Sequence, residues 1–271
     1  MARYTPWAKG RYEVGPALRQ FGTDFGNGEE DKQVFQFRDD AERLLANKQA
    51  CLNERRDKYF ARHNLKPEVE AAAIQVIQSQ VPTDGSLDEI ALQVPEDIAI
   101  VTTDGTQDWL AYGSLCAPSH WALEEKIGRS FATVHDPIPG FDKVTAVAPK
   151  MIDAMVNKGP WVRFVWSLES DDRPNHHPHA PPGWDQAEWW GRQFKEKLRF
   201  WVRVERQCLV PLPNVQSALF TIRLSWWTME EILCDQLLRQ PLIRALNGMT
   251  QPERAYKGID EEFHSLLALL K

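Results

Sequence analysis

Two strand-like stretches near the middle of this chain decide its fold. Residues 200–210 read FWVRVERQCLV and residues 218–227 read ALFTIRLSWW. Both are rich in β-branched and aromatic residues, which is typical of β-strands. Between them lie Pro211, Pro213 and Asn214, residues that favour a turn. The sequence therefore predicts an antiparallel pair of strands at the centre of a sheet.

Charged residues interrupt both of these strands. Alternation of side chains puts Glu205 on one face of the first strand and Arg206 on the other. If the turn centres near Asn214, Glu205 lies roughly opposite Arg223. A carboxylate and a guanidinium in a central sheet must pair with each other, with a ligand or with water. The pair is therefore either a structural salt bridge or the polar part of a ligand pocket.

The flanking sequence predicts further strands surrounded by helices. Residues 98–102 and 109–116 form a hairpin through the turn dipeptide Asp104-Gly105, and residues 161–168 form another strand. We expect helices over 38–63, from Pro67, from Ser119 as N-cap, over 145–157, and over 229–271 with breaks at Pro241 and Gly248. The prediction is a single α+β domain over residues 1–271. It has a helical shell (1–95), a core with a helical crossover (96–228) and C-terminal helices (229–271).

Composition narrows the class of protein. The 32 basic and 38 acidic residues are mixed along the 271-residue chain, which argues against a nucleic-acid binder. The four cysteines lie far apart, so neither a zinc knuckle nor a disulfide framework is expected. No apolar run has the length of a signal peptide or a membrane span. We therefore expect a cytoplasmic protein that contacts no membrane.

Tryptophan is unusually frequent. Eight of the eleven tryptophans fall between Trp161 and Trp227. Wide, flat side chains suit the walls of a pocket for a planar guest, and an aromatic core is the ordinary alternative.

Two groups of histidines invite a metal. His135 is followed by a proline-rich segment whose stiff backbone would hold the imidazole in a fixed direction, as an iron ligand requires. A structural histidine is the alternative, and His120 lies in a neighbouring motif. His176, His177 and His179 occur in the proline-rich stretch NHHPHAPP (175–182). There we expect a solvated loop, with a metal site as the alternative.

Several of these stretches together resemble one known family, that of the haem-dependent oxidative N-demethylases. The resemblance rests on motifs that occur in the family's order: PWAKGRY (6–12), LCAPSHWALEEKIG (115–128), VHDPIPG (134–140), VRVERQ (202–207) and LFTIR (219–223). It implies a PAS-like fold that holds haem b. By the family pattern, His135 is the iron ligand, Glu205 and Arg223 serve the substrate and oxygen side, Arg206 meets a haem propionate, and Trp121 helps to wall the cofactor.

The resemblance also implies an activity. A monooxygenase of this kind removes a methyl group from a small secondary amine such as dimethylamine and releases it as formaldehyde, using O2. Electrons come from a separate NAD(P)H-dependent reductase that carries flavin and a 2Fe-2S centre. The chain itself has no GxGxxG after a strand and no iron–sulfur cysteine spacing. The alternatives are a non-catalytic PAS-like sensor of haem or a small molecule, and an interaction protein without cofactor. One departure is that Val165 stands where the family usually has asparagine.

Overall fold

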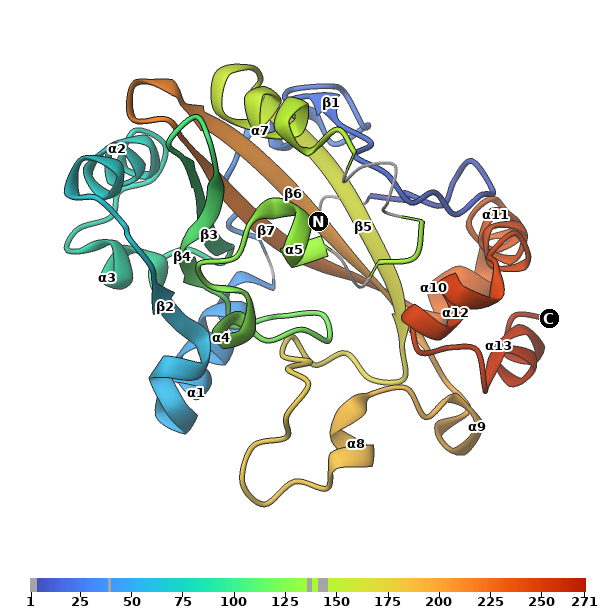
Figure 1. The fold of residues 1–271 in the computed structure, drawn as a ribbon. Coiled ribbons are helices and arrows are strands. Elements are labelled where there is room, and N and C mark those ends of the chain that lie inside the picture. The colour runs from blue at the N-terminus through green and yellow to red at the C-terminus, as the bar shows by residue number, and fades with distance from the viewer. Residues whose placement is uncertain (1–3, 39, 136–137, 141–145) are drawn as a thin grey trace.

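A seven-stranded antiparallel sheet forms the centre of the molecule (Figure 1). The computed structural model describes residues 4–38, 40–135, 138–140 and 146–271. The strands follow the order β1-β5-β6-β7-β3-β4-β2 across the sheet, and every neighbouring pair is antiparallel. Their bounds are β1 (Arg19–Gln20), β2 (Phe60–Arg62), β3 (Asp97–Thr103), β4 (Asp108–Ser114), β5 (Trp161–Glu169), β6 (Trp201–Leu212) and β7 (Ser217–Thr228). The predicted α+β class is confirmed.

Different elements pack on the two faces of the sheet. We call these the Glu205 face and the Arg206 face, after the residues of β6 that point to each. On the Glu205 face, α5 (Phe131–His135) and α7 (Ala148–Asn157) pack against β6 and β7, and α4 (Leu123–Lys126) lies beside them. Residues 170–199 extend from the end of β5 and contain α8 (Gln186–Trp190) and α9 (Phe194–Lys197). In Figure 1 this excursion lies below the sheet, away from α7.

Two hydrophobic clusters cover the Arg206 face. α2 (Pro67–Gln78) and α3 (Leu87–Ala91) cover one half. The C-terminal helices cover the other half: α10 (Met229–Cys234), α11 (Gln236–Asn247), α12 (Gln251–Tyr256) and α13 (Phe263–Leu269). α1 (Ala41–Tyr59) contacts cores on both faces, with Leu44 on one side and Cys51 on the other. In the described part of the chain, no helix is both long and apolar enough to cross a membrane.

The hairpin and the three later strands were predicted correctly, but some details differ. β1 and β2 come from the expected helical shell and extend the sheet at its two edges. Ser119 does not cap a helix, because α4 begins at Leu123 after Ala122. Pro241 does not break the last helical region, since it lies inside α11, which continues to Asn247. The helix tolerates the lost backbone donor there.

The N-terminal segment is anchored along the edge of the sheet beside β5. Trp7 is completely buried, and its indole Nε1–H donates a hydrogen bond to the carbonyl of Leu238, 3.1 Å away. The ring meets Trp166 of β5 and Trp227 of β7 edge-on. Tyr4 donates to a carboxylate oxygen of Asp31 at 2.9 Å. This segment is therefore fixed to the sheet and to the C-terminal helices at once.

We expect Trp7→Ala to lower the free energy of unfolding by about 3–5 kcal/mol, because it leaves a large cavity and an unpaired carbonyl. The matched control is Trp184→Ala, since Trp184 is 51% exposed. Its loss should be several-fold smaller. Urea unfolding followed by circular dichroism measures both, and equal losses would show that the N-terminal anchor contributes little.

Candidate functional site

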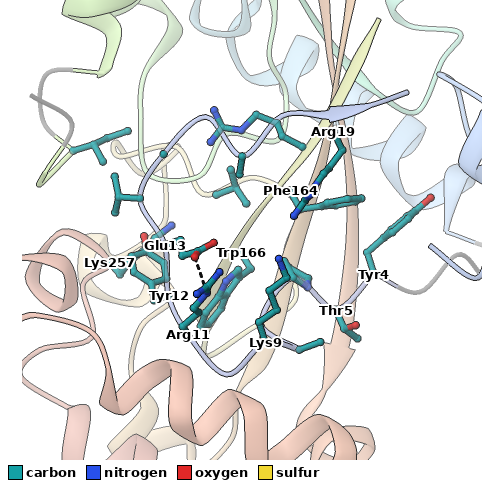
Figure 2. Close-up of a pocket in the computed structure, with 18 of the residues that line it drawn as sticks. Tyr4, Thr5, Lys9, Arg11, Tyr12, Glu13, Arg19, Phe164, Trp166 and Lys257 are labelled. Atoms are coloured by element: carbon teal, nitrogen blue, oxygen red, sulfur yellow. Dashed lines mark ion pairs between the residues drawn. The ribbon is translucent and has the colours of Figure 1, made fainter. Parts of the chain in front are cut away.

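A cavity of about 340 Å³ lies between the N-terminal segment and the edge of β5 (Figure 2). The N-terminal segment supplies one wall and residues 163–166 of β5 supply a second. His135 and Ile138 contribute from the Glu205 face, and Tyr256 and Lys257 close the cavity from the C-terminal helices. Its volume is within the range of small-molecule sites. Segments distant in sequence thus converge on one concave space.

His135 stands in this cavity at the end of α5. Its Nδ1 lies 2.8 Å from the carbonyl oxygen of Phe131. A carbonyl can only accept, so Nδ1 carries the proton and the lone pair of the ring is on Nε2. Burial lowers the pKa of His135 to about 4. A neutral imidazole whose other nitrogen donates to a backbone carbonyl is the form in which histidine usually binds metals.

Two cations of the lining, Arg163 and Lys257, are distinguished by their side chains. Among the described residues, neither side chain has a hydrogen-bond or ion-pair partner, and Nε of Arg163 is buried. Desolvation lowers the pKa of both groups, to about 8 for Lys257. The Lys257 ammonium lies 5.9 Å from the ring centre of Tyr12 and 5.8 Å from that of Tyr256. Half-buried charges without partners are costly, so this cavity suits an anionic group.

Glu205 lies close to these two cations. It is 7% exposed and points to the same face of the sheet as Arg163, because it pairs directly with Val165. Gln207 donates a hydrogen bond to it at 2.8 Å, and Arg203 approaches to 3.8 Å. Burial is the largest influence on the pKa values of Arg163 and Lys257 and lowers both. The negative charge of Glu205 is the second largest influence and raises both.

The expected pairing of Glu205 with Arg223 is wrong. Glu205 pairs with Leu224, and Arg223 pairs with Arg206. The innermost pair is Leu212 with Ser217, so the turn centres half a residue beyond Asn214. That small change moves the register by one residue and places Arg223 on the opposite face from Glu205.

Arg206 and Arg223 are held on the Arg206 face by their own partners. Arg223 donates to the carbonyl of Gln36 at 3.0 Å and forms ion pairs with Asp40 and Glu96. Arg206 donates to the carbonyl of Asp31 at 3.3 Å. Neither is among the described residues that line the cavity.

Trp121 is also outside the described lining of the cavity. It packs on the Glu205 face against the hydrophobic cluster that includes Leu224 and Trp226. Of the five candidates, only His135 is among the described residues that line the cavity. Glu205 lies beside that wall without lining it, because it pairs directly with Val165, which does line the cavity. Arg163 and Lys257 were missed. A charged residue inside the apolar strand 161–168 was a signal for Arg163, whereas nothing in the local sequence marks Lys257.

The first part of the histidine-rich loop is buried, contrary to the expectation of a solvated loop. His176 and His177 are each 1% exposed, whereas His179 and Pro182 are exposed as expected. The backbone N–H of His176 donates to the carbonyl of Pro118 at 3.1 Å, and that of His120 donates to the carbonyl of His176 at 2.9 Å. The fully buried Arg203 donates to the carbonyl of Pro174 at 2.7 Å. The loop folds inward because it satisfies a buried guanidinium.

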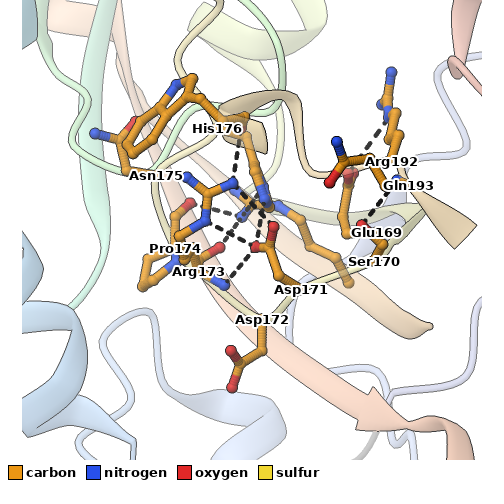
Figure 3. A network of polar contacts seen from close by, with 12 residues as sticks. Glu169, Ser170, Asp171, Asp172, Arg173, Pro174, Asn175, His176, Arg192 and Gln193 are labelled. Carbon is orange, nitrogen blue, oxygen red and sulfur yellow. Dashed lines mark hydrogen bonds and ion pairs between the residues drawn. The ribbon is translucent and has the colours of Figure 1, made fainter. Parts of the chain in front are cut away.

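One cluster near this loop has the composition of a metal site. Single ligand atoms of His120, Glu169 and His176 lie within 4.8 Å of one another. Protein groups already engage them: Nε2 of His120 is 3.0 Å from Glu169, which also pairs with Arg192 at 3.4 Å, and Nε2 of His176 is 3.0 Å from Asp171 (Figure 3). The two imidazoles are stacked nearly parallel, 5.2 Å apart. The arrangement is that of a hydrogen-bonded network that anchors the loop.

The depressed pKa of His135 makes stability depend on pH. In the unfolded chain the ring takes up a proton near pH 6.5, whereas in the folded chain it stays neutral down to about pH 4. The unfolded state binds more protons in this window, so stability falls as pH falls through it. Above pH 6.5 the effect is absent. The loss contributed by His135 reaches about 2.5 kcal/mol at pH 4.5.

We expect His135→Phe to remove this part of the pH dependence, measured as the difference in unfolding free energy between pH 7 and pH 4.5. His264→Phe, at an exposed ring, is the control and should keep the dependence of the original chain. An unchanged pH dependence in His135→Phe would contradict a buried neutral ring.

A comparison with protein families identifies the chain. The model described as "Haem-dependent oxidative N-demethylase, alpha subunit-like" matches residues 33–267. This range includes β2 to β7 and the cavity residues His135, Arg163 and Lys257. The resemblance seen in the sequence motifs is confirmed, and the chain belongs to the haem-dependent oxidative N-demethylase alpha subunit-like family.

Proposed function

We propose that this chain is the haem-binding subunit of a monooxygenase that demethylates a secondary amine, with haem b in the described cavity and His135 as the ligand to its iron. One observation carries the proposal. An imidazole with its lone pair on Nε2 faces the same cavity as two cations whose side chains have no hydrogen-bond or ion-pair partner in the described part of the chain, in a member of a haem-dependent family.

The residues present fit haem in three respects. His135 offers a neutral nitrogen whose direction is fixed by the hydrogen bond to Phe131. Arg163 offers a guanidinium to a propionate, which pairs well with a carboxylate. Tyr12, Phe164 and Trp166 add aromatic surface to the lining.

Bound haem would supply the activation of O2, which is chemistry that side chains cannot perform. The chain's own residues position the amine and move protons. Glu205 provides a negative charge that attracts a protonated amine. Lys257, with a pKa of about 8, can hold or release a proton near neutral pH. Val165 makes this part of the wall apolar.

In this proposal, the contact with a haem propionate falls to Arg163 instead of Arg206. Arg206 and Arg223 hold the far side of β6 and β7. Trp121 packs behind the cavity, in the hydrophobic cluster on the Glu205 face.

The description "alpha subunit-like" supports an assembly with other subunits. We propose a separate reductase with flavin and a 2Fe-2S centre as the source of electrons, and the cytoplasm as the compartment. The hairpin β3–β4, the helical crossover and the meander β5–β6–β7 that returns to β3 support a PAS-like core.

Titration with haem tests the ligand. We expect the original chain to bind haem with the spectrum of a histidine-ligated protein. His135→Ala should bind haem at least about tenfold more weakly, and added imidazole should restore the original spectrum, because the lost group is one nitrogen donor. His264→Ala is the control and should behave as the original chain. A spectrum unaltered by His135→Ala would move the ligand elsewhere.

The role of Glu205 is tested by amine affinity. Glu205→Gln should weaken the binding of a protonated secondary amine by about 10–100-fold, the worth of one charge-assisted hydrogen bond. The shift of the haem absorption band on amine addition measures this. The control is Glu13→Gln, at an exposed carboxylate of the same cavity that pairs with Arg11 at 2.6 Å. Equal effects of the two substitutions would remove Glu205 from the substrate role.

A further inference from the structure

The described lining of the cavity is strongly positive. Its acidic member Glu13 pairs with Arg11 at 2.6 Å. Five cations lie around the same space: Lys9, Arg11, Arg19, Arg163 and Lys257. These five positive charges exceed the three negative charges of Glu13 and the two propionates of a bound haem. A positive lining repels a simple dialkylammonium ion and attracts ligands that carry an anionic group.

Lys257 is the cation best placed to meet such a group. Its ammonium lies beside the rings of Tyr12 and Tyr256, with no ion pair or hydrogen bond to any residue that the structure describes. An ammonium has three donors, and burial without acceptors is costly. A ligand carboxylate in the cavity would satisfy these donors.

A negative charge lies beside another wall of this cavity. Glu205 is not among the described lining residues, but it pairs directly with Val165, which is. Its charge raises the pKa of Lys257, and no ion pair joins the two described groups. A ligand with a carboxylate at Lys257 and an ammonium toward the Val165 wall would therefore have both of its charges favourably placed. Such a ligand is a zwitterion.

We propose that the substrate is a secondary N-methylamine that carries a carboxylate a few bonds from its nitrogen, as an N-methylated amino acid does. Lys257 binds the carboxylate, and the ammonium lies toward the Val165 wall that Glu205 adjoins. This inference rests on the proposed function. In the reaction, a methyl C–H bond is replaced by C–O with one atom of O2, and the other atom leaves as water. The reductase supplies two electrons, and two protons are consumed. The C–N bond then breaks to give formaldehyde and the primary amine.

Three probes test the inference on the haem-loaded protein. They are N-methylglycine, its amide, which lacks the negative charge, and dimethylamine. Affinity is measured from the shift of the haem absorption band, and turnover from formaldehyde release with the reductase or a chemical reductant. We expect N-methylglycine to bind at least about tenfold more tightly than its amide, the scale of one charge-assisted contact.

Variants assign this preference to Lys257. Lys257→Met should abolish the preference for N-methylglycine over its amide, and Lys257→Arg should retain it. Lys66→Met, at an exposed lysine outside the described lining, is the control and should also retain it. Thermal melting of each variant shows whether it is folded. If Lys257→Met does not fold, the test falls to Lys257→Arg, in which loss of the preference would contradict the inference.

The inference and the proposed function fail in different ways. Binding of dimethylamine or the amide as tight as that of N-methylglycine, together with formaldehyde release from dimethylamine, would overturn the inference and leave the proposed function standing. A preference that survives in Lys257→Met would also overturn it. Absence of haem binding by the original chain would overturn the proposed function itself.

Discussion

The register between β6 and β7 is the constraint on which the rest of the structure depends. Twelve residue pairs join the two strands, from Trp201 with Thr228 to Leu212 with Ser217. This register places Glu205 on the same face as the cavity residues Arg163 and Val165, and it sets Arg206 directly against Arg223 on the other face. A slip by one residue would exchange the faces of every side chain on one strand.

Two guanidinium groups side by side need acceptors, and the Arg206 face provides them unequally. Asp40 and Glu96 pair with Arg223, whereas Arg206 donates to the backbone carbonyl of Asp31 and lies 5.8 Å from the ring centre of Tyr4. Burial raises the pKa of Glu96 to about 6, although the charge of Arg223 opposes this shift. The contrast with the cavity is informative. Buried cations that stabilise the fold have acceptors within the chain, whereas Arg163 and Lys257 have none among the described residues.

Strands with alternating β-branched residues were predictable, and so was the hairpin around Asp104-Gly105. The register was not, because the turn is a short 3-10 segment followed by Gln216 with a left-handed backbone, and its centre cannot be located from Pro211, Pro213 and Asn214 alone. His135 lies in the lining of the cavity because the helix that contains it ends there, and its role as an iron ligand stays a prediction. The burial of Asn175, His176 and His177 was not predictable, because the composition of the loop suits solvent and the buried Arg203 that the preceding Pro174 contacts lies far away in sequence. Lys257 was not predictable either, because residues that line the cavity with it, such as Tyr12 and Arg163, lie far away in sequence.

The N-terminal wall of the cavity depends on an anchor that lies outside the cavity. Trp7 is completely buried and donates to the carbonyl of Leu238, so the stretch that includes Lys9, Arg11 and Tyr12 is fastened to the C-terminal helices. Lys257, on another wall, directly follows one of these helices. Any displacement of the C-terminal helices would consequently shift both walls in concert, so the width of the opening is governed by a part of the chain that barely touches a guest.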